Sequence, residues 1–103
     1  MKAEIYFNHI LAGILEKKEN NYMFSYDENY LKSTHPAISF SFPKHSNLYQ
    51  STSLFPFFFG LLSEGINKEI QCKAYQIDEK DEFTRLLKTA KNDTIGAITV
   101  QEI

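Results

Sequence analysis

Residues 3–26 read AEIYFNHILAGILEKKENNYMFSY, and the patterns within this stretch predict three strands joined by two turns. Apolar and polar side chains alternate over residues 3–8, which is the period-two pattern of a half-buried strand. Asn8-His9 can adopt the positive φ values of a tight turn and leads into a second strand over residues 10–16. A polar stretch ending in two asparagines predicts another turn, and alternating aromatics predict a third strand over residues 22–26. The first quarter of the chain is therefore expected to form an antiparallel meander.

The rest of the chain predicts short helices and two further extended segments. In order, the patterns indicate a helix over residues 28–32 capped by Asp27, an extended segment over 38–42, a loop over 44–53, helices over 54–62 and 66–77, a helix over 83–90 capped by Asp81, and a last strand over 95–100. We expect an α+β fold in which a small antiparallel sheet, the N-terminal meander plus later strands, packs against three to four short helices. A chain of 103 residues can bury one core, so we expect a single domain over residues 1–103.

Charge and cysteine content exclude several classes of protein. The chain has 11 Lys and Arg against 13 Asp and Glu and no basic run longer than Lys17-Lys18, so direct binding to nucleic acid is not expected. The single Cys72 cannot form an internal disulfide, and the N-terminus lacks the apolar core of a signal peptide. We therefore expect a cytoplasmic protein. No apolar run approaches the roughly 20 residues that span a bilayer, so no membrane partner is expected either.

Motifs for catalysis and cofactor binding are absent from the sequence. It contains no glycine-rich phosphate loop, no G-x-S-x-G, no H-E-x-x-H and no C-x-x-C. His9, His35 and His45 share no helical face, which favours ordinary turn residues over metal ligands. We expect Cys72 to be a buried, inert thiol, and a nucleophile formed with His45 is the enzymatic alternative. The prediction is thus a protein without catalytic residues, cofactor or metal.

Aromatic residues are the unusual feature of the composition. They make up 15% of the chain, and four of the nine phenylalanines fall within residues 55–59. On a helix over residues 54–62, apolar side chains point in three directions around the axis, which is more than one small sheet can cover. This helix is either wholly core, or core on one face and interface on the other. The number of apolar directions favours the second interpretation.

Residues 57–66, FFFGLLSEGI, resemble the stretch F-F-x-x-L-L-P-E-G-W of the N-terminal subdomain of HipA-type toxin kinases. Further pieces agree in order and spacing: Tyr6-Phe7-Asn8 with Gly13, Phe24-Ser25-Tyr26 with Tyr30-Leu31, residues 38–43 (ISFSFP) and residues 93–100 (DTIGAITV). The likeness covers nearly the whole chain. It departs from the family pattern where His9 replaces a turn glycine, Ser63 a proline and Ile66 a tryptophan.

The resemblance extends to the HipS-type antitoxins of the split HipBST systems, in which the kinase HipT and the DNA-binding HipB are separate chains. It implies a non-enzymatic antitoxin that binds a HipT-type serine/threonine kinase in trans and inhibits it. Inhibition would work either by disfavouring ATP binding at the nucleotide loop of the kinase or by occluding its substrate. The alternative function is a non-inhibitory scaffold that links the kinase to a DNA-bound HipB-type repressor in a ternary complex.

The expected partner-binding residues lie on the helix over residues 54–62 and on the junction that follows it. They are Phe55, Phe57, Phe58, Leu62, Ser63, Glu64 and Ile66. Phe57 or Phe58, together with Ile66, are the expected anchors, because large apolar side chains carry most of the energy of an interface. Glu64 is expected either as a polar contact at the rim or as a cap of the next helix.

Overall fold

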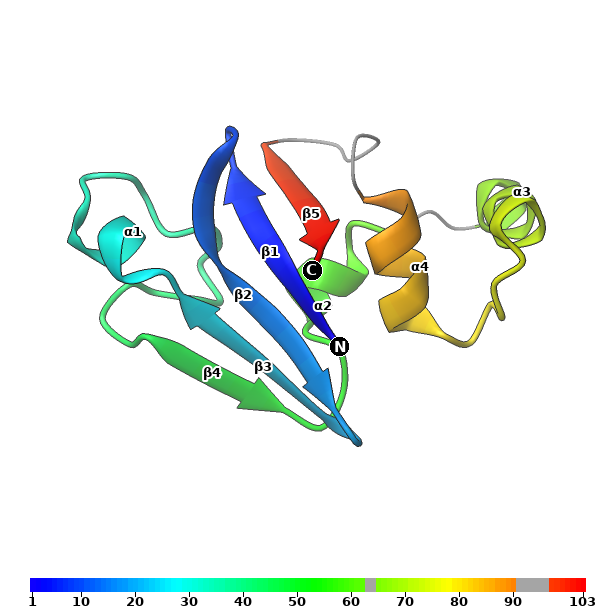
Figure 1. Ribbon diagram of the computed structural model, residues 1–103, viewed down its shortest axis with the longest axis horizontal. Helices are drawn as coiled ribbons and strands as arrows, with labels where there is room; N and C mark the ends of the chain where they lie inside the picture. Colours follow the sequence, from blue (N-terminus) through cyan, green and yellow to red (C-terminus); the bar gives the residue numbers. More distant parts are fainter. Residues whose placement is uncertain (63–64, 91–96) are drawn as a thin grey trace.

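The computed structural model describes residues 1–62, 65–90 and 97–103. Within these residues, five strands form one antiparallel sheet in the order β4-β3-β2-β1-β5, accompanied by four short helices (Figure 1). The predicted α+β fold is confirmed. In chain order the elements are β1 (Lys2–Phe7), β2 (Ile10–Lys18), β3 (Asn21–Tyr26), α1 (Glu28–Lys32), β4 (Leu48–Ser51), α2 (Pro56–Phe59), α3 (Gly65–Tyr75), α4 (Glu82–Thr89) and β5 (Ile98–Glu102).

The N-terminal meander forms as its alternation predicts. Asn8 and His9 adopt φ values of 49° and 67° at the turn from β1 to β2, and Glu19 has a φ of 57° at the next turn. Two successive positive φ values at Asn8 and His9 match the right-handed twist of the strands that they join. The turn in which histidine stands in place of glycine therefore has the geometry of a tight hairpin.

A β-bulge in β2 explains the glycine at its centre. Ile5 pairs with Gly13 and Tyr6 pairs with Leu11, so Ala12 is the extra residue on this strand. A β-carbon at Gly13 would lie 2.3 Å from the carbonyl oxygen of Ser25, which no side chain tolerates. The close approach of β2 and β3 at this point thus requires glycine.

One face of the sheet carries the core. Its fully buried side chains include Ile5, Leu15 and Phe24, each from a different strand of the meander. Phe58 of α2 packs on Phe24 with 5.8 Å between ring centroids, so α2 covers this face. On the opposite face, side chains such as that of Ile14 on β2 are only partly buried. The sheet is therefore one-sided, as the alternating sequence predicts.

Helix α4 closes the core beside β5. Asp81 accepts hydrogen bonds from the backbone N–H of Thr84 at 3.2 Å and from its hydroxyl at 2.8 Å, which confirms the predicted N-cap. The helix buries Phe83, Leu86 and Leu87. At its end, the Val100 N–H donates to the Ala90 carbonyl at 2.9 Å and ties β5 to the helix.

Helix α3 stands beyond α4, at the end of the molecule opposite to α1 (Figure 1). It ends at Tyr75, so the predicted continuation to residue 77 was wrong. The physical reason is Gln76, whose φ of 56° breaks the helix. The Ile77 N–H then bonds back to the Cys72 carbonyl at 2.8 Å, which caps the last turn.

The middle of the chain corrects two predictions. Residues 38–42 were predicted to be extended, but they form a turn in which the Phe42 N–H donates to the Ser39 carbonyl at 3.1 Å. Residues 44–53 were predicted to be a loop, but they contain β4, which extends the meander by pairing with β3. The reason is Tyr49, which lies opposite Phe24 in register and packs against Phe42 at 5.2 Å. Tertiary contacts therefore override the polar composition here.

The predicted last strand is shifted. It runs over Ile98–Glu102, whereas the prediction was residues 95–100, and residues 95 and 96 lie outside the described residues. No helix in the described part of the chain has the length and apolar character needed to cross a membrane.

Candidate partner-binding surface

Helix α2 is a single turn, so the helix predicted over residues 54–62 was too long. Pro56 occupies the first helical position, where its fixed φ suits the helix and its missing N–H costs nothing. Phe58 and Phe59 both donate their N–H groups to the Phe55 carbonyl at 3.0 Å. Leu61 then donates to the carbonyl three residues back, Phe58, at 3.1 Å, so the chain tightens and leaves the helix after Gly60.

Phe58 is the centre of an aromatic cluster in the core. Its side chain is fully buried. Its ring centroid lies 5.8 Å from that of Phe24, 5.7 Å from Phe42 and 6.2 Å from Phe55. Tilted and edge-on arrangements at these distances are the favourable ones for aromatic pairs. This part of the phenylalanine-rich segment therefore belongs to the core of the chain itself.

The structure separates the predicted partner-binding residues into three groups. Phe55, Phe58 and Leu62 are buried in the core, and Phe57 is partly buried against it. Ser63 and Glu64 lie outside the described residues. The backbone of Ile66 belongs to α3, and its side chain is not among the described ones.

Some apolar side chains near α2 stay accessible. Phe59 is 41% exposed, and Pro56 is exposed as well. Phe57 and Leu61 pack against the core but are only partly buried. We call Pro56, Phe57, Phe59 and Leu61 the α2 rim. Phe57 is the one predicted partner-binding residue that belongs to the rim. The phenylalanine of α2 that is exposed is Phe59, and Phe58 is buried.

Sequence reasoning missed Phe40. The alternation of Ile38, Phe40 and Phe42 predicted a strand with all three side chains on one face. In the turn that forms instead, Ile38 and Phe42 are buried, whereas Phe40 is completely exposed. The available signal was Pro36 and Pro43 on either side, because proline is disfavoured within a sheet.

Buried tyrosines hold the segment that carries Phe40. The Tyr26 hydroxyl donates to the Phe42 carbonyl and accepts from the Ile38 N–H at 3.1 Å. The Tyr30 hydroxyl donates to the Pro36 carbonyl at 2.6 Å. Burial raises the pKa of both Tyr26 and Tyr30 above the ordinary value of a phenol. Both hydroxyls therefore keep their protons, and with them these bonds, at neutral pH.

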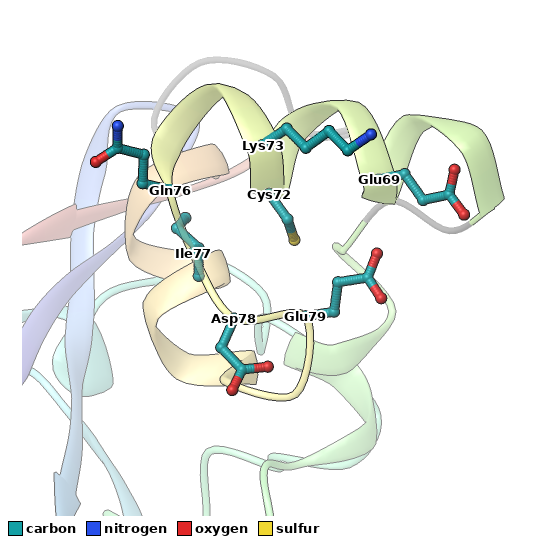
Figure 2. Close-up of a pocket in the computed structure, with 7 residues that line it drawn as sticks. All are labelled: Glu69, Cys72, Lys73, Gln76, Ile77, Asp78 and Glu79. Atoms are coloured by element: carbon teal, nitrogen blue, oxygen red, sulfur yellow. The ribbon is translucent and has the colours of Figure 1, made fainter.

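A separate hollow lies beneath α3 (Figure 2). It has a volume of about 590 Å³ and is lined by Glu69, Cys72, Lys73, Gln76, Ile77, Asp78 and Glu79. Figure 2 shows the sulfur of Cys72 turned into it and the carboxylate of Asp78 turned away. His45, the base of the enzymatic alternative, does not line this hollow. Cys72 itself is buried, as predicted.

The histidines are distributed over different parts of the molecule. His9 lines a hollow with Tyr6 and Thr99 beside β1 and β5, whereas His35 stacks on the Tyr30 ring at 5.6 Å. Over residues 1–62, 65–90 and 97–103, no group of three or more His, Cys, Asp or Glu side chains is placed to hold a metal ion.

Comparison with known proteins identifies the family. Residues 3–101 match the family described as HipA N-terminal domain. A Haemophilus influenzae protein described only as uncharacterized is 34% identical over 90 residues, which are 87% of this chain and 81% of that protein. A solved structure of the N-terminal domain of HipA toxin superposes with a TM-score of 0.74 at 29% identity, over 98% of this chain and 92% of that chain. The chain therefore belongs to the HipA N-terminal domain family and is associated through it with HipA-type toxin–antitoxin proteins.

Proposed function

We propose that this chain is a non-enzymatic, cytoplasmic antitoxin that binds a HipT-type serine/threonine toxin kinase in trans and inhibits it. The observation that carries the proposal is the match of residues 3–101 to the HipA N-terminal domain. A domain of this kind in a kinase toxin must face the rest of that protein, and a separate copy can bind the same kind of surface. The Haemophilus influenzae relative supports a separate role, since the matched part is 81% of its length.

The proposed contact is the α2 rim together with the junction over residues 63–66. Phe59 is 41% exposed and Phe57 partly buried, so both can lose further solvent-accessible area on binding. Partly exposed aromatic side chains that rest on a rigid core are typical anchors of interfaces, because little conformational entropy is lost when they bind. In this proposal Phe55, Phe58 and Leu62 contribute indirectly, because they form the part of the core that supports the rim. In the junction, Ser63, Glu64 and Ile66 are the proposed contacts.

Inhibition is proposed to act on the nucleotide loop of the kinase. A ligand shifts a conformational equilibrium only as far as it binds one state more tightly than the other. If the antitoxin binds more tightly to a loop conformation that cannot accept ATP phosphates, ATP affinity falls, and ATP weakens antitoxin binding by the same factor. Substrate occlusion, in contrast, leaves ATP affinity unchanged.

The test uses the purified kinase with and without the full chain. We expect a stable complex, loss of kinase activity, and weaker ATP binding measured by titration calorimetry. The double variant Phe57→Ala/Phe59→Ala should weaken the complex, whereas Leu48→Thr should not, because Leu48 lies on the opposite face of the sheet from α2.

Growth experiments separate the antitoxin from the scaffold. Co-expression of an antitoxin with the kinase relieves growth arrest. A scaffold that only joins the kinase to a HipB-type repressor would co-purify with both proteins and leave growth arrested. No complex with the kinase at micromolar concentrations would contradict both functions.

A further inference from the structure

Phe40 is the most exposed large apolar side chain of the described residues. Its relative exposure is 104%, so the ring has no more protein contact than it would have in an extended chain. The folded chain therefore gains no burial energy from this side chain. A single exposed apolar residue is common, and what distinguishes Phe40 is the segment that presents it.

The backbone around Phe40 is rigidly held. On its two sides, the Ile38 N–H and the Phe42 carbonyl both bond to the Tyr26 hydroxyl. The Tyr49 hydroxyl donates to the Pro43 carbonyl. The Lys44 ammonium donates to the carbonyls of Ser33 at 2.9 Å and His35 at 2.8 Å. These bonds fix the backbone on both sides of Phe40, and such preorganisation of the backbone lowers the entropic cost of binding.

Beside Phe40 lies an apolar groove. It has a volume of about 640 Å³ and is lined by Pro36, Ala37, Ile38, Ser39, Phe40, Pro43 and Lys44. A protruding ring next to a groove can fill an apolar pocket of a partner while the groove accepts an apolar side chain in return. We call this segment, residues 36–44, the Phe40 loop.

The Phe40 loop is continuous with the α2 rim. Phe42, two residues from Phe40, packs edge-on against Phe57 of the rim with 6.0 Å between ring centroids. The Cα atoms of residues two apart are separated by at most about 7 Å. A partner that covers the α2 rim therefore lies within reach of the Phe40 loop.

Charge decides which partner fits. Between Asn29 and Ser63 the sequence contains Lys32 and Lys44 but no aspartate or glutamate. Two copies of the chain joined through this loop would bring lysines together without a carboxylate from the same segment, which opposes self-association. Opposite charge on the partner would instead favour association.

We infer that the Phe40 loop is a second part of the proposed kinase contact, in which Phe40 enters an apolar pocket of the kinase that is bordered by carboxylates. The inference rests on the proposed function and adds to it a residue, a groove and the charge of the matching surface. The kinase would then contact both the α2 rim and the Phe40 loop.

The decisive experiment measures the affinity of the full chain for the HipT-type kinase. Phe40→Ser should weaken binding at least about tenfold, as expected for an interface anchor. Leu48→Thr removes an apolar side chain that is 44% exposed on the other face and should leave the affinity unchanged. Circular dichroism should show that both variants fold.

Charge is tested at Ser41, which is exposed and adjacent to Phe40. Ser41→Glu should weaken kinase binding and Ser41→Lys should preserve or strengthen it, with a difference between the two that shrinks as salt concentration rises. If the two variants changed kinase affinity equally, the inference that carboxylates border the kinase pocket would be wrong.

The outcomes distinguish this inference from the function on which it rests. If the wild-type chain binds the kinase and Phe40→Ser binds equally well, the Phe40 loop is not part of the contact and only the inference fails. If the wild-type chain does not bind the kinase, the proposed function fails and the inference fails with it. If the free chain is a dimer that Phe40→Ser converts to a monomer, a second copy occupies the loop and the kinase assignment is wrong.

Discussion

The α2 segment and the Phe40 loop use phenylalanine in opposite ways. Phe58 is completely buried, whereas Phe40 is 104% exposed, although Phe42, two residues from Phe40, packs on Phe58. The number of apolar residues in each segment does not account for the difference. It comes from the backbone, because the single turn of α2 directs Phe58 onto Phe24, while the turn over residues 39–42 directs Phe40 into solvent.

If the proposed contact is correct, stability and binding depend on different phenylalanines, Phe58 in the core and Phe40 on the surface. Phe58 should contribute to the free energy of unfolding and only indirectly to binding. Phe40 should contribute to binding and hardly to folding. Substitutions at the two positions, and at Tyr26, test this contrast.

The largest effect is expected for Phe58→Ala. Removing a fully buried ring at the centre of the cluster should lower the free energy of unfolding by about 3–5 kcal/mol, measured by urea denaturation followed by circular dichroism. Phe59→Ala, one residue away and 41% exposed, is the matched control and should cost about 1 kcal/mol or less. Equal losses for the two variants would mean that burial does not distinguish the two positions.

A smaller effect is expected for Tyr26→Phe. This change removes the hydroxyl that bonds to the Ile38 N–H and the Phe42 carbonyl and leaves both groups without that partner. The expected loss is about 1–3 kcal/mol, measured by the same denaturation experiment. Tyr22→Phe serves as the control, because the Tyr22 hydroxyl makes no hydrogen bond within residues 1–62, 65–90 and 97–103. A Tyr26→Phe variant as stable as the control would show that the hydroxyl does not hold the Phe40 loop.

Stability should also depend on alkaline pH. Burial raises the pKa of Tyr26 and Tyr30 above 10.0 in the folded state, so the protonated form is favoured by folding. The stability that these groups contribute is fully present below the unfolded pKa of about 10 and is lost as pH rises through their folded values. Unfolding free energy should therefore change little from these tyrosines between pH 7 and 9 and fall above pH 10. The decline should be shallower in Tyr26→Phe, and an identical decline would contradict the assignment to Tyr26.

The smallest effect on stability is expected for Phe40→Ser. A side chain without protein contacts should change the unfolding free energy by less than about 0.5 kcal/mol. Its thermal midpoint should match that of the wild-type chain within about 4 °C. A loss comparable to that of Phe58→Ala would show that Phe40 belongs to the core, and the contrast between the two segments would disappear.

Prediction from the sequence worked best where local pattern and tertiary structure agree. Residues 3–8 and 22–26 alternate, and β1, β2 and β3 form with turns at residues 8–9, as predicted, and 19–20, one residue before the predicted asparagine pair. Asp27 and Asp81 cap helices as their positions indicated, since a carboxylate near exposed N–H groups needs no distant partner.

Prediction failed where a long-range contact selects the structure. The polar segment containing β4 becomes a strand because β3 offers an edge and Tyr49 meets Phe42 beneath the sheet. The alternating residues 38–42 become a turn because the Tyr26 hydroxyl bonds to both ends of the segment. Neither partner is a sequence neighbour, so periodicity could not indicate these contacts.

The candidate site follows the same rule. The sequence singled out the phenylalanine-rich segment and the junction over residues 63–66, but it could not distinguish Phe58, which is buried, from Phe59, which is partly exposed. On a helix the two residues point in directions about 100° apart, and only the position of the sheet decides which direction is covered. Phe40 was missed because residues 38–42 form a turn in place of the predicted extended segment.

From the amino acids alone came the antiparallel meander, the capped helices, the α+β class and the resemblance to the HipA N-terminal subdomain, because these depend on local spacing and on motifs in a fixed order. The tertiary structure decided the fourth strand of the meander, the length of α2 and the exposure of each phenylalanine. Those properties depend on which surfaces meet after folding, because an apolar side chain can be buried either in the core or against a partner.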